Sequence, residues 1–104
     1  MIRHITLFNL KPGIREPELE WLLEKISGMK EITAVRELEV GRLLTPREDW
    51  YKPRMATDYG WALSMEFDNE NSLYAFQTDP HHLTVAREIR KRASAVRVMD
   101  FVIL

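Results

Sequence analysis

The 104-residue sequence contains no cysteine and is poor in glycine, with four residues, and in proline, with five. Without cysteine the chain has no disulfide, no thiol nucleophile and no thiolate metal site. The scattered glycines form no Gly-rich phosphate loop, and no Gly-x-Ser-x-Gly turn of a serine hydrolase is present. Three histidines without a metal-ligand spacing also give no zinc set. We therefore expect no metal and no cofactor.

Charge and hydropathy argue against two further classes of protein. Fifteen Lys and Arg residues against sixteen Asp and Glu give a net charge of −1, whereas a nucleic-acid-binding protein normally has a basic excess. No apolar run approaches the roughly 18 residues of a membrane span, and the alternating pattern from Ile2 onwards leaves no secretory hydrophobic segment. We expect one cytoplasmic domain over residues 1–104 that binds neither nucleic acid nor a membrane.

The hydrophobic periodicity predicts a βαββαβ order of elements. Period-two alternation predicts strands over residues 2–11, 32–42, 57–67 and 96–104, and helical periodicity predicts helices over residues 16–28 and about 72–93, the second with a fresh start at Asp79-Pro80. This order is the split βαβ, or ferredoxin-like, pattern of the α+β class, with a four-stranded antiparallel sheet and the helices on one face. The first and last strands are apolar on both faces. We therefore predict a homodimer in which a second copy covers the open sheet face.

Five segments of the chain carry a family resemblance. They are the opening MIRHITLF with its KPG turn, LEVGR, YGWAL followed by EFD, YAFQTDPHH and the closing VMDF. Together they resemble the stress-responsive A/B barrel (Dabb) family of dimeric α/β barrels over nearly the whole chain. The resemblance implies the ferredoxin-like fold and a two-fold dimer. Because most members of the family have no defined activity, it implies no particular reaction.

His82 is the first candidate for a catalytic group. It lies on the apolar stripe of the helix that starts at Pro80, so it should point inward while His81 faces solvent. A buried imidazole needs a partner, and Asp100 on the last strand is the available acid, close to His4 on the first strand. A histidine oriented by a carboxylate is the arrangement of a general base. The alternative is structural: the pair could hold the helix to the sheet, and His4 could bond across the strands or the dimer.

The family resemblance implies more specific roles for these residues. A plant polyketide cyclase of the family uses the histidine of its Pro-x-His motif as the catalytic base, supported by an aspartate of its last strand; these positions correspond to His82 and Asp100. Its first-strand histidine corresponds to His4. Its catalytic tyrosine corresponds to Phe76, which cannot donate a hydrogen bond. If the chain is an enzyme, the resemblance to this cyclase implies cofactor-free acid–base chemistry of the lyase or cyclase type, with one group missing.

Aromatic residues offer a candidate ligand site. Phe8, Tyr59, Trp61 and Phe76 could line a pocket for a flat apolar ligand, although such a row can equally belong to the core. The irregular stretch from Leu43 to Ala56 could be a lid or a dimer arm.

Four functions stay open from the sequence. The first is a Dabb-type protein of undefined role that binds a small aromatic or polyketide-like ligand. The second is a cofactor-free cyclase-like enzyme with His82 as base, and the third is a non-catalytic scaffold. The fourth, by fold analogy alone, is a haem-binding or cofactor-independent monooxygenase-like protein.

Overall fold

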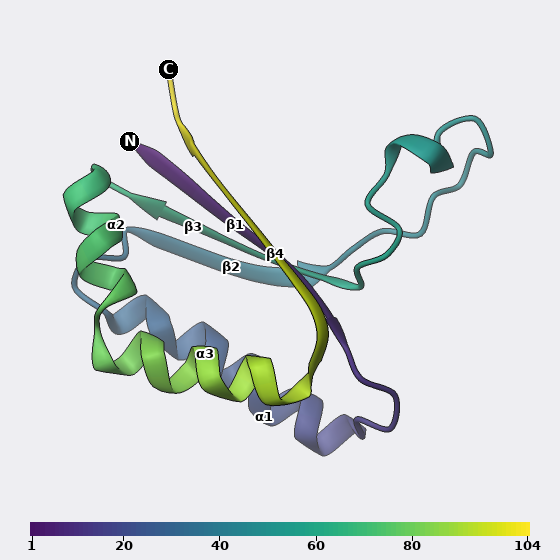
Figure 1. Cartoon of the computed structure of the whole chain (residues 1–104), viewed down its shortest axis with the longest axis horizontal. Coiled ribbons are helices and arrows are strands. Elements are labelled where there is room, and N and C mark those ends of the chain that lie inside the picture. The colour runs from purple at the N-terminus through teal and green to yellow at the C-terminus, as the bar shows by residue number, and fades with distance from the viewer.

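The computed structural model describes all residues from Met1 to Leu104 (Figure 1). Its elements are β1 (Ile2–Leu10), α1 (Glu16–Gly28), the 3-10 turn η1 (Met29–Glu31), β2 (Glu37–Arg42), the 3-10 turn η2 (Lys52–Arg54), β3 (Trp61–Phe67), α2 (Glu70–Gln77), α3 (Pro80–Arg92) and β4 (Ala93–Val102). The predicted βαββαβ order is confirmed, with the second helical region divided into α2 and α3. None of the helices has the length and apolar character needed to cross a membrane.

The four strands form one antiparallel sheet in the order β2-β3-β1-β4. Figure 1 shows the helices gathered on one side of this sheet, while the other side carries no helix. The predicted ferredoxin-like fold is therefore confirmed. In this arrangement β4 is an edge strand and pairs only with β1.

Alternation along the strands places the core between sheet and helices. In β1 the even-numbered residues from Ile2 to Phe8 are buried, and the odd-numbered residues are only partly buried. Helix α1 contributes Leu22 and Ile26, one turn apart on a single stripe, and both are fully buried. Because directly paired residues share a face of a sheet, the partners of β1 in β3 complete the same apolar layer.

Local capping signals fix where the helices begin. The side chain of Asn69 accepts a hydrogen bond from the backbone N–H of Ser72 at 2.9 Å and caps α2. Asp79 accepts from the N–H of His81 at 2.8 Å, with Pro80 in the first helical position of α3. A sharp stop and restart between α2 and α3 follows. It places His82 in the first turn of α3, where its side chain faces α2.

Three predicted strand boundaries were wrong by several residues. Strand β2 starts at Glu37 instead of Ile32, because residues 29–35 form consecutive turns in which the N–H of Val35 bonds to the carbonyl of Ile32 at 2.9 Å. These apolar residues are buried as anchors of a turn and not as members of a strand. Strand β3 starts at Trp61 instead of Thr57, and β4 covers Ala93–Val102 instead of residues 96–104.

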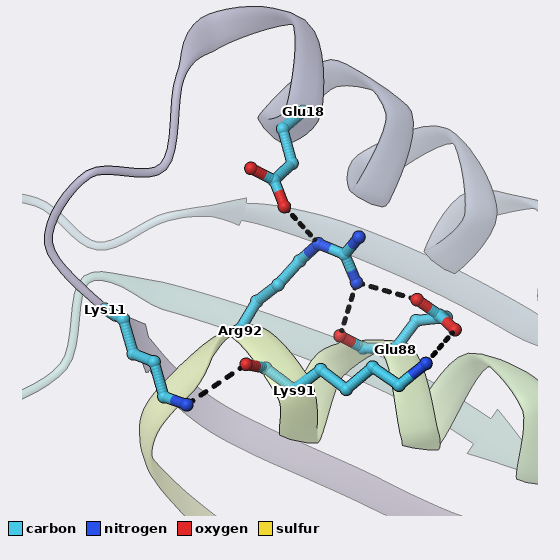
Figure 2. A network of polar contacts seen from close by, with 5 residues as sticks. All are labelled: Lys11, Glu18, Glu88, Lys91 and Arg92. Carbon is cyan, nitrogen blue, oxygen red and sulfur yellow. Dashed lines mark hydrogen bonds and ion pairs between the residues drawn. The ribbon is translucent and has the colours of Figure 1, made fainter.

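A charged network joins the end of α3 to α1 (Figure 2). The guanidinium of Arg92 donates to Glu18 of α1 and to Glu88 of its own helix, each at 2.7 Å. It also lies 4.8 Å from the ring centre of Trp21. The hydrogen bond from Arg92, with help from Lys91, holds the pKa of the Glu88 carboxyl below its ordinary value. The network fixes the helix layer at the end of α3 that leads into β4.

The Arg92→Met variant should be less stable than the wild type. The Arg92 side chain is 19% exposed, and its partner Glu88 is better shielded from water than its partner Glu18, which is 41% exposed. The loss of these pairs should lower the melting temperature by a few degrees. Arg87→Met, on the exposed side of α3, is the matched control and should change the melting temperature little. Equal melting temperatures for the two variants would contradict a stabilising role for the network.

Candidate functional site

An open cavity of about 390 Å³ lies between the sheet and α3. Thirteen residues line it, and eight of them are hydrophobic. The polar members are His4, Thr6, Gln77, His82 and Arg90. The edge strand β4 supplies Val96 and Val98, both partly exposed. The cavity therefore has a mainly apolar wall with two imidazoles and one guanidinium set into it.

His4 is held by hydrogen bonds on both of its ring nitrogens. Its Nδ1 lies 2.5 Å from the Oδ1 of Asp100, and its Nε2 lies 3.0 Å from the hydroxyl of Thr6. Since a carboxylate can only accept, Nδ1 carries the proton and donates a hydrogen bond to Asp100. For the neutral ring, Nε2 then accepts from the Thr6 hydroxyl. His4, which is 7% exposed, is thus fixed in orientation and has no free lone pair in this state.

His82 has the opposite pattern, with one nitrogen left free. Its Nδ1 lies 3.2 Å from the backbone carbonyl of Gln77, which can only accept, so Nδ1 carries the proton and Nε2 keeps its lone pair. The ring centre lies 4.1 Å from that of Phe76, which holds the imidazole in place. No other residue of the chain bonds to Nε2. A neutral imidazole with a free lone pair on a cavity wall is the geometry of a general base.

The environment of His82 favours its neutral form. Burial lowers the pKa of its imidazole below the ordinary value of 6.5, and charge repulsion from Arg90 lowers it further. The bond to the carbonyl of Gln77 acts in the opposite direction and only partly offsets the burial. The Nε2 lone pair is therefore available at neutral pH.

The predicted pairing of Asp100 with His82 was wrong. Asp100 lies directly opposite His4 in the β1–β4 register, so the two side chains share one face of neighbouring strands. His82 instead bonds to the end of α2, and Phe76 makes ring contacts with both histidines. His4 and His82 both line the cavity, whereas Asp100 does not line it and instead orients His4.

Of the four predicted ligand-binding aromatics, only Phe76 lines the cavity. Phe8 is fully buried and packs on Trp61, their ring centres 6.4 Å apart and their planes 15° apart. Trp61 also lies under the guanidinium of Arg42. Tyr59 precedes β3 and belongs to a separate surface hollow at the base of the β2–β3 loop. Alternation predicted the correct face for Phe8 and Trp61, but it does not show the position along the strand that a cavity occupies.

Several cavity residues were missed by the sequence reasoning. Thr6 is one strand repeat after His4, and Arg90 is two helical turns after His82, so both spacings carried a usable signal. Gln77 contributes through its backbone carbonyl, which no side-chain pattern reveals.

The loop between β2 and β3 projects away from the body of the molecule (Figure 1). Its tip carries Trp50 and Tyr51, whose rings are stacked with centres 5.4 Å apart. No residue of this loop lines the cavity. The lid interpretation therefore gains no support from this chain, and the dimer-arm interpretation stays a prediction.

The fold and this cavity define a ferredoxin-like α+β protein with an open pocket lined by two histidines. The sequence profile of the stress responsive A/B barrel domain matches residues 2–103. The chain therefore belongs to this family. No curated protein sequence matches it significantly.

Solved structures from bacteria and plants share the fold. A Dabb family protein from Mesorhizobium loti is 24% identical, with a TM-score of 0.79 over 99% of this chain and 96% of that one. A dimeric ferredoxin-like protein of unknown function from Thermobifida fusca is 21% identical, with a TM-score of 0.79 over 98% and 90%. The hydroxynitrile lyase from Passiflora edulis is 18% identical, with a TM-score of 0.85 over 99% and 93%. At these identities the likeness concerns the fold alone.

Proposed function

We propose that the cavity binds a small aromatic or polyketide-like molecule. The observation that carries this proposal is a cavity of about 390 Å³ with a mainly apolar wall and a few convergent polar groups. Ligand pockets in proteins have this composition and volumes of roughly 300–1,000 Å³. A volume near the lower end of that range suits a molecule of one or two rings better than a porphyrin.

Filling the cavity should abolish binding without unfolding the protein. Ala86 lines the cavity and is partly buried on α3, so the Ala86→Trp variant places an indole ring in the ligand's space. With indole as the probe, we expect calorimetry to show at least about a tenfold loss of affinity. Ala75→Trp is the matched control, because Ala75 is exposed on α2 and does not line the cavity. Equal affinity in both variants would place the ligand elsewhere.

Proton-transfer catalysis is the second candidate function. The specific observation in its favour is His82, whose Nε2 lone pair is free and whose proton is held on Nδ1 by Gln77. One structural neighbour is a hydroxynitrile lyase, and the resemblance to a plant polyketide cyclase implies the same base. Phe76 supplies no hydroxyl, so the reaction must do without a phenolic donor at that position.

The open sheet face supports a homodimer as the state in which this site functions. The face carries Ile5, Leu7, Met99 and Phe101, and the last two are 56% and 45% exposed. It is also charged in two halves, with Arg3 and Arg97 on the β1–β4 side and Glu37 and Glu39 on β2. A two-fold axis along the strands places the acidic half over the partner's basic half. Neighbours from Thermobifida fusca and Bacteroides fragilis are described as dimeric.

A charge placed in the centre of this face should separate the subunits. The Met99→Glu variant buries an unpaired carboxylate in the proposed interface, and we expect it to sediment as a monomer at concentrations where the wild type is a dimer. Leu83→Glu on α3 is the control, since Leu83 is equally apolar and 46% exposed but lies on the helix side. A monomeric wild type, or a dimeric Met99→Glu variant, would contradict this interface.

A further inference from the structure

Arg90 differs from the other basic residues near the end of α3. Lys91 pairs with Glu88, and Arg92 pairs with both Glu88 and Glu18. Arg90, which directly precedes Lys91, makes no ion pair and no side-chain hydrogen bond within the chain. It lines the cavity together with His82 and Ala86, at the eighth and fourth positions before it on the same helix. Its five donors are thus available to a molecule in the cavity.

No carboxylate of the protein neutralises this charge from within the cavity. None of the thirteen lining residues is Asp or Glu, and the nearby Asp100 is engaged by His4. The cavity therefore combines an apolar body with one uncompensated cation at its wall. Such a combination favours an apolar ligand that carries one negative charge.

The donor set distinguishes between kinds of anion. A guanidinium matches a planar carboxylate with two parallel N–H···O bonds. A phosphate dianion is usually held by several donors at once, such as a glycine-rich loop or a helix N-terminus, and the cavity lining includes neither a lysine nor a glycine. A single arginine fits a monocarboxylate better.

The position of Arg90 also suits a ligand that reaches His82. Eight residues along an α-helix correspond to about 12 Å, and helical side chains lean back toward the N-terminus. The guanidinium of Arg90 therefore extends toward the His82 end of the cavity. A carboxylate bound to it would leave the apolar body of the ligand between Arg90 and His82.

We propose that the ligand of this cavity is an apolar, preferably aromatic, monocarboxylic acid whose carboxylate is bound by Arg90. This inference rests on the proposed small-molecule function and specifies its ligand class. Arg90 selects the charged end of the ligand, and the apolar wall and Phe76 accommodate its ring.

The test compares an acid with its neutral, nearly isosteric amide. Phenylacetate and phenylacetamide are titrated by calorimetry into the wild type, Arg90→Gln and Arg87→Gln. In the wild type we expect phenylacetate to bind about tenfold more tightly, as is usual for a charge-assisted pair. In Arg90→Gln the preference should vanish while the amide affinity is kept. Arg87→Gln, exposed on the same helix and outside the cavity, should behave as the wild type.

The outcomes separate this inference from the proposal beneath it. If the amide binds as well as the acid in the wild type, or if Arg90→Gln keeps the acid preference, the role of Arg90 is overturned and the cavity remains a binding site. If neither compound binds, and indole binding is also insensitive to Ala86→Trp, the proposed function and the inference fail together.

Discussion

Replacing His82 by glutamine is expected to remove about 100-fold or more of the base-catalysed turnover in the cavity while leaving the protein folded. Glutamine cannot accept a proton at neutral pH, but its amide can still donate to the carbonyl of Gln77 in place of Nδ1. The loss should therefore appear in the rate constant and not in the melting temperature. A general structural role for His82 predicts the reverse.

The assay requires only a base beside an apolar cavity. In nitrobenzisoxazole, removal of the ring C–H proton by His82 Nε2 is accompanied by cleavage of the N–O bond, and the released cyanophenolate is measured by its absorbance. His81→Gln is the matched control, because His81 is the exposed neighbour in the same helical turn. Equal rates for the two variants would show that His82 is not the base.

The pH dependence adds a second readout with a defined sign. Because the pKa of His82 is lowered in the folded state, the rate should rise through that lowered pKa and be level above the ordinary value of about 6.5. The unfolded chain binds the proton more tightly, so His82 makes the native state lose stability as pH falls below about 6.5. The His82→Gln variant should lose less stability than the wild type below about pH 6.5, and the pH dependence of stability above that value should be unchanged.

Truncating Phe8 should have the largest effect on stability. Phe8 is fully buried and stacks on Trp61 in the core, so Phe8→Ala is expected to cost about 3–5 kcal/mol. The free energy of unfolding of a domain is only about 5–15 kcal/mol, so this loss is a large part of the total. The stability of Phe8→Ala is measured by urea unfolding, with the milder substitution Phe8→Leu as the control. The loss in Phe8→Leu should be smaller.

The same variants distinguish core from ligand site. Because Phe8 does not line the cavity, folded Phe8→Leu should bind indole with the affinity of the wild type. If the folded Phe8→Leu variant bound indole more weakly than the wild type, Phe8 would belong to the ligand site predicted from the sequence.

Patterns that depend on neighbouring residues predicted the fold well. The alternation that predicted a strand over residues 2–11 corresponds to β1 within one residue, and the Asp79-Pro80 restart corresponds to the start of α3. The start of β2 could not be read in this way, because Ile32 and Val35 are buried by a turn. An apolar pattern indicates which residues are buried, but it does not indicate whether those residues pair with a neighbouring strand.

Only part of the cavity lining could be predicted from the sequence, and the bonds between its residues could not. His4, His82 and Phe76 do meet at one cavity, because strand face and helix stripe are local properties. The partner of Asp100 depends on the β1–β4 register, and the orientation of His82 depends on a backbone carbonyl of α2. Both are set by packing between elements distant in sequence, which periodicity does not describe.

The most direct test of the central claim is a crystal structure of the protein with indole. We expect ring density inside the cavity, against Phe76 and within reach of His82 Nε2, with His4 still bonded to Asp100. An inward movement of β4 that fills the space with Val96 and Val98, or indole bound only on the open sheet face, would contradict it. The cavity would then be part of the core, and the dimer surface would remain as the functional feature of the chain.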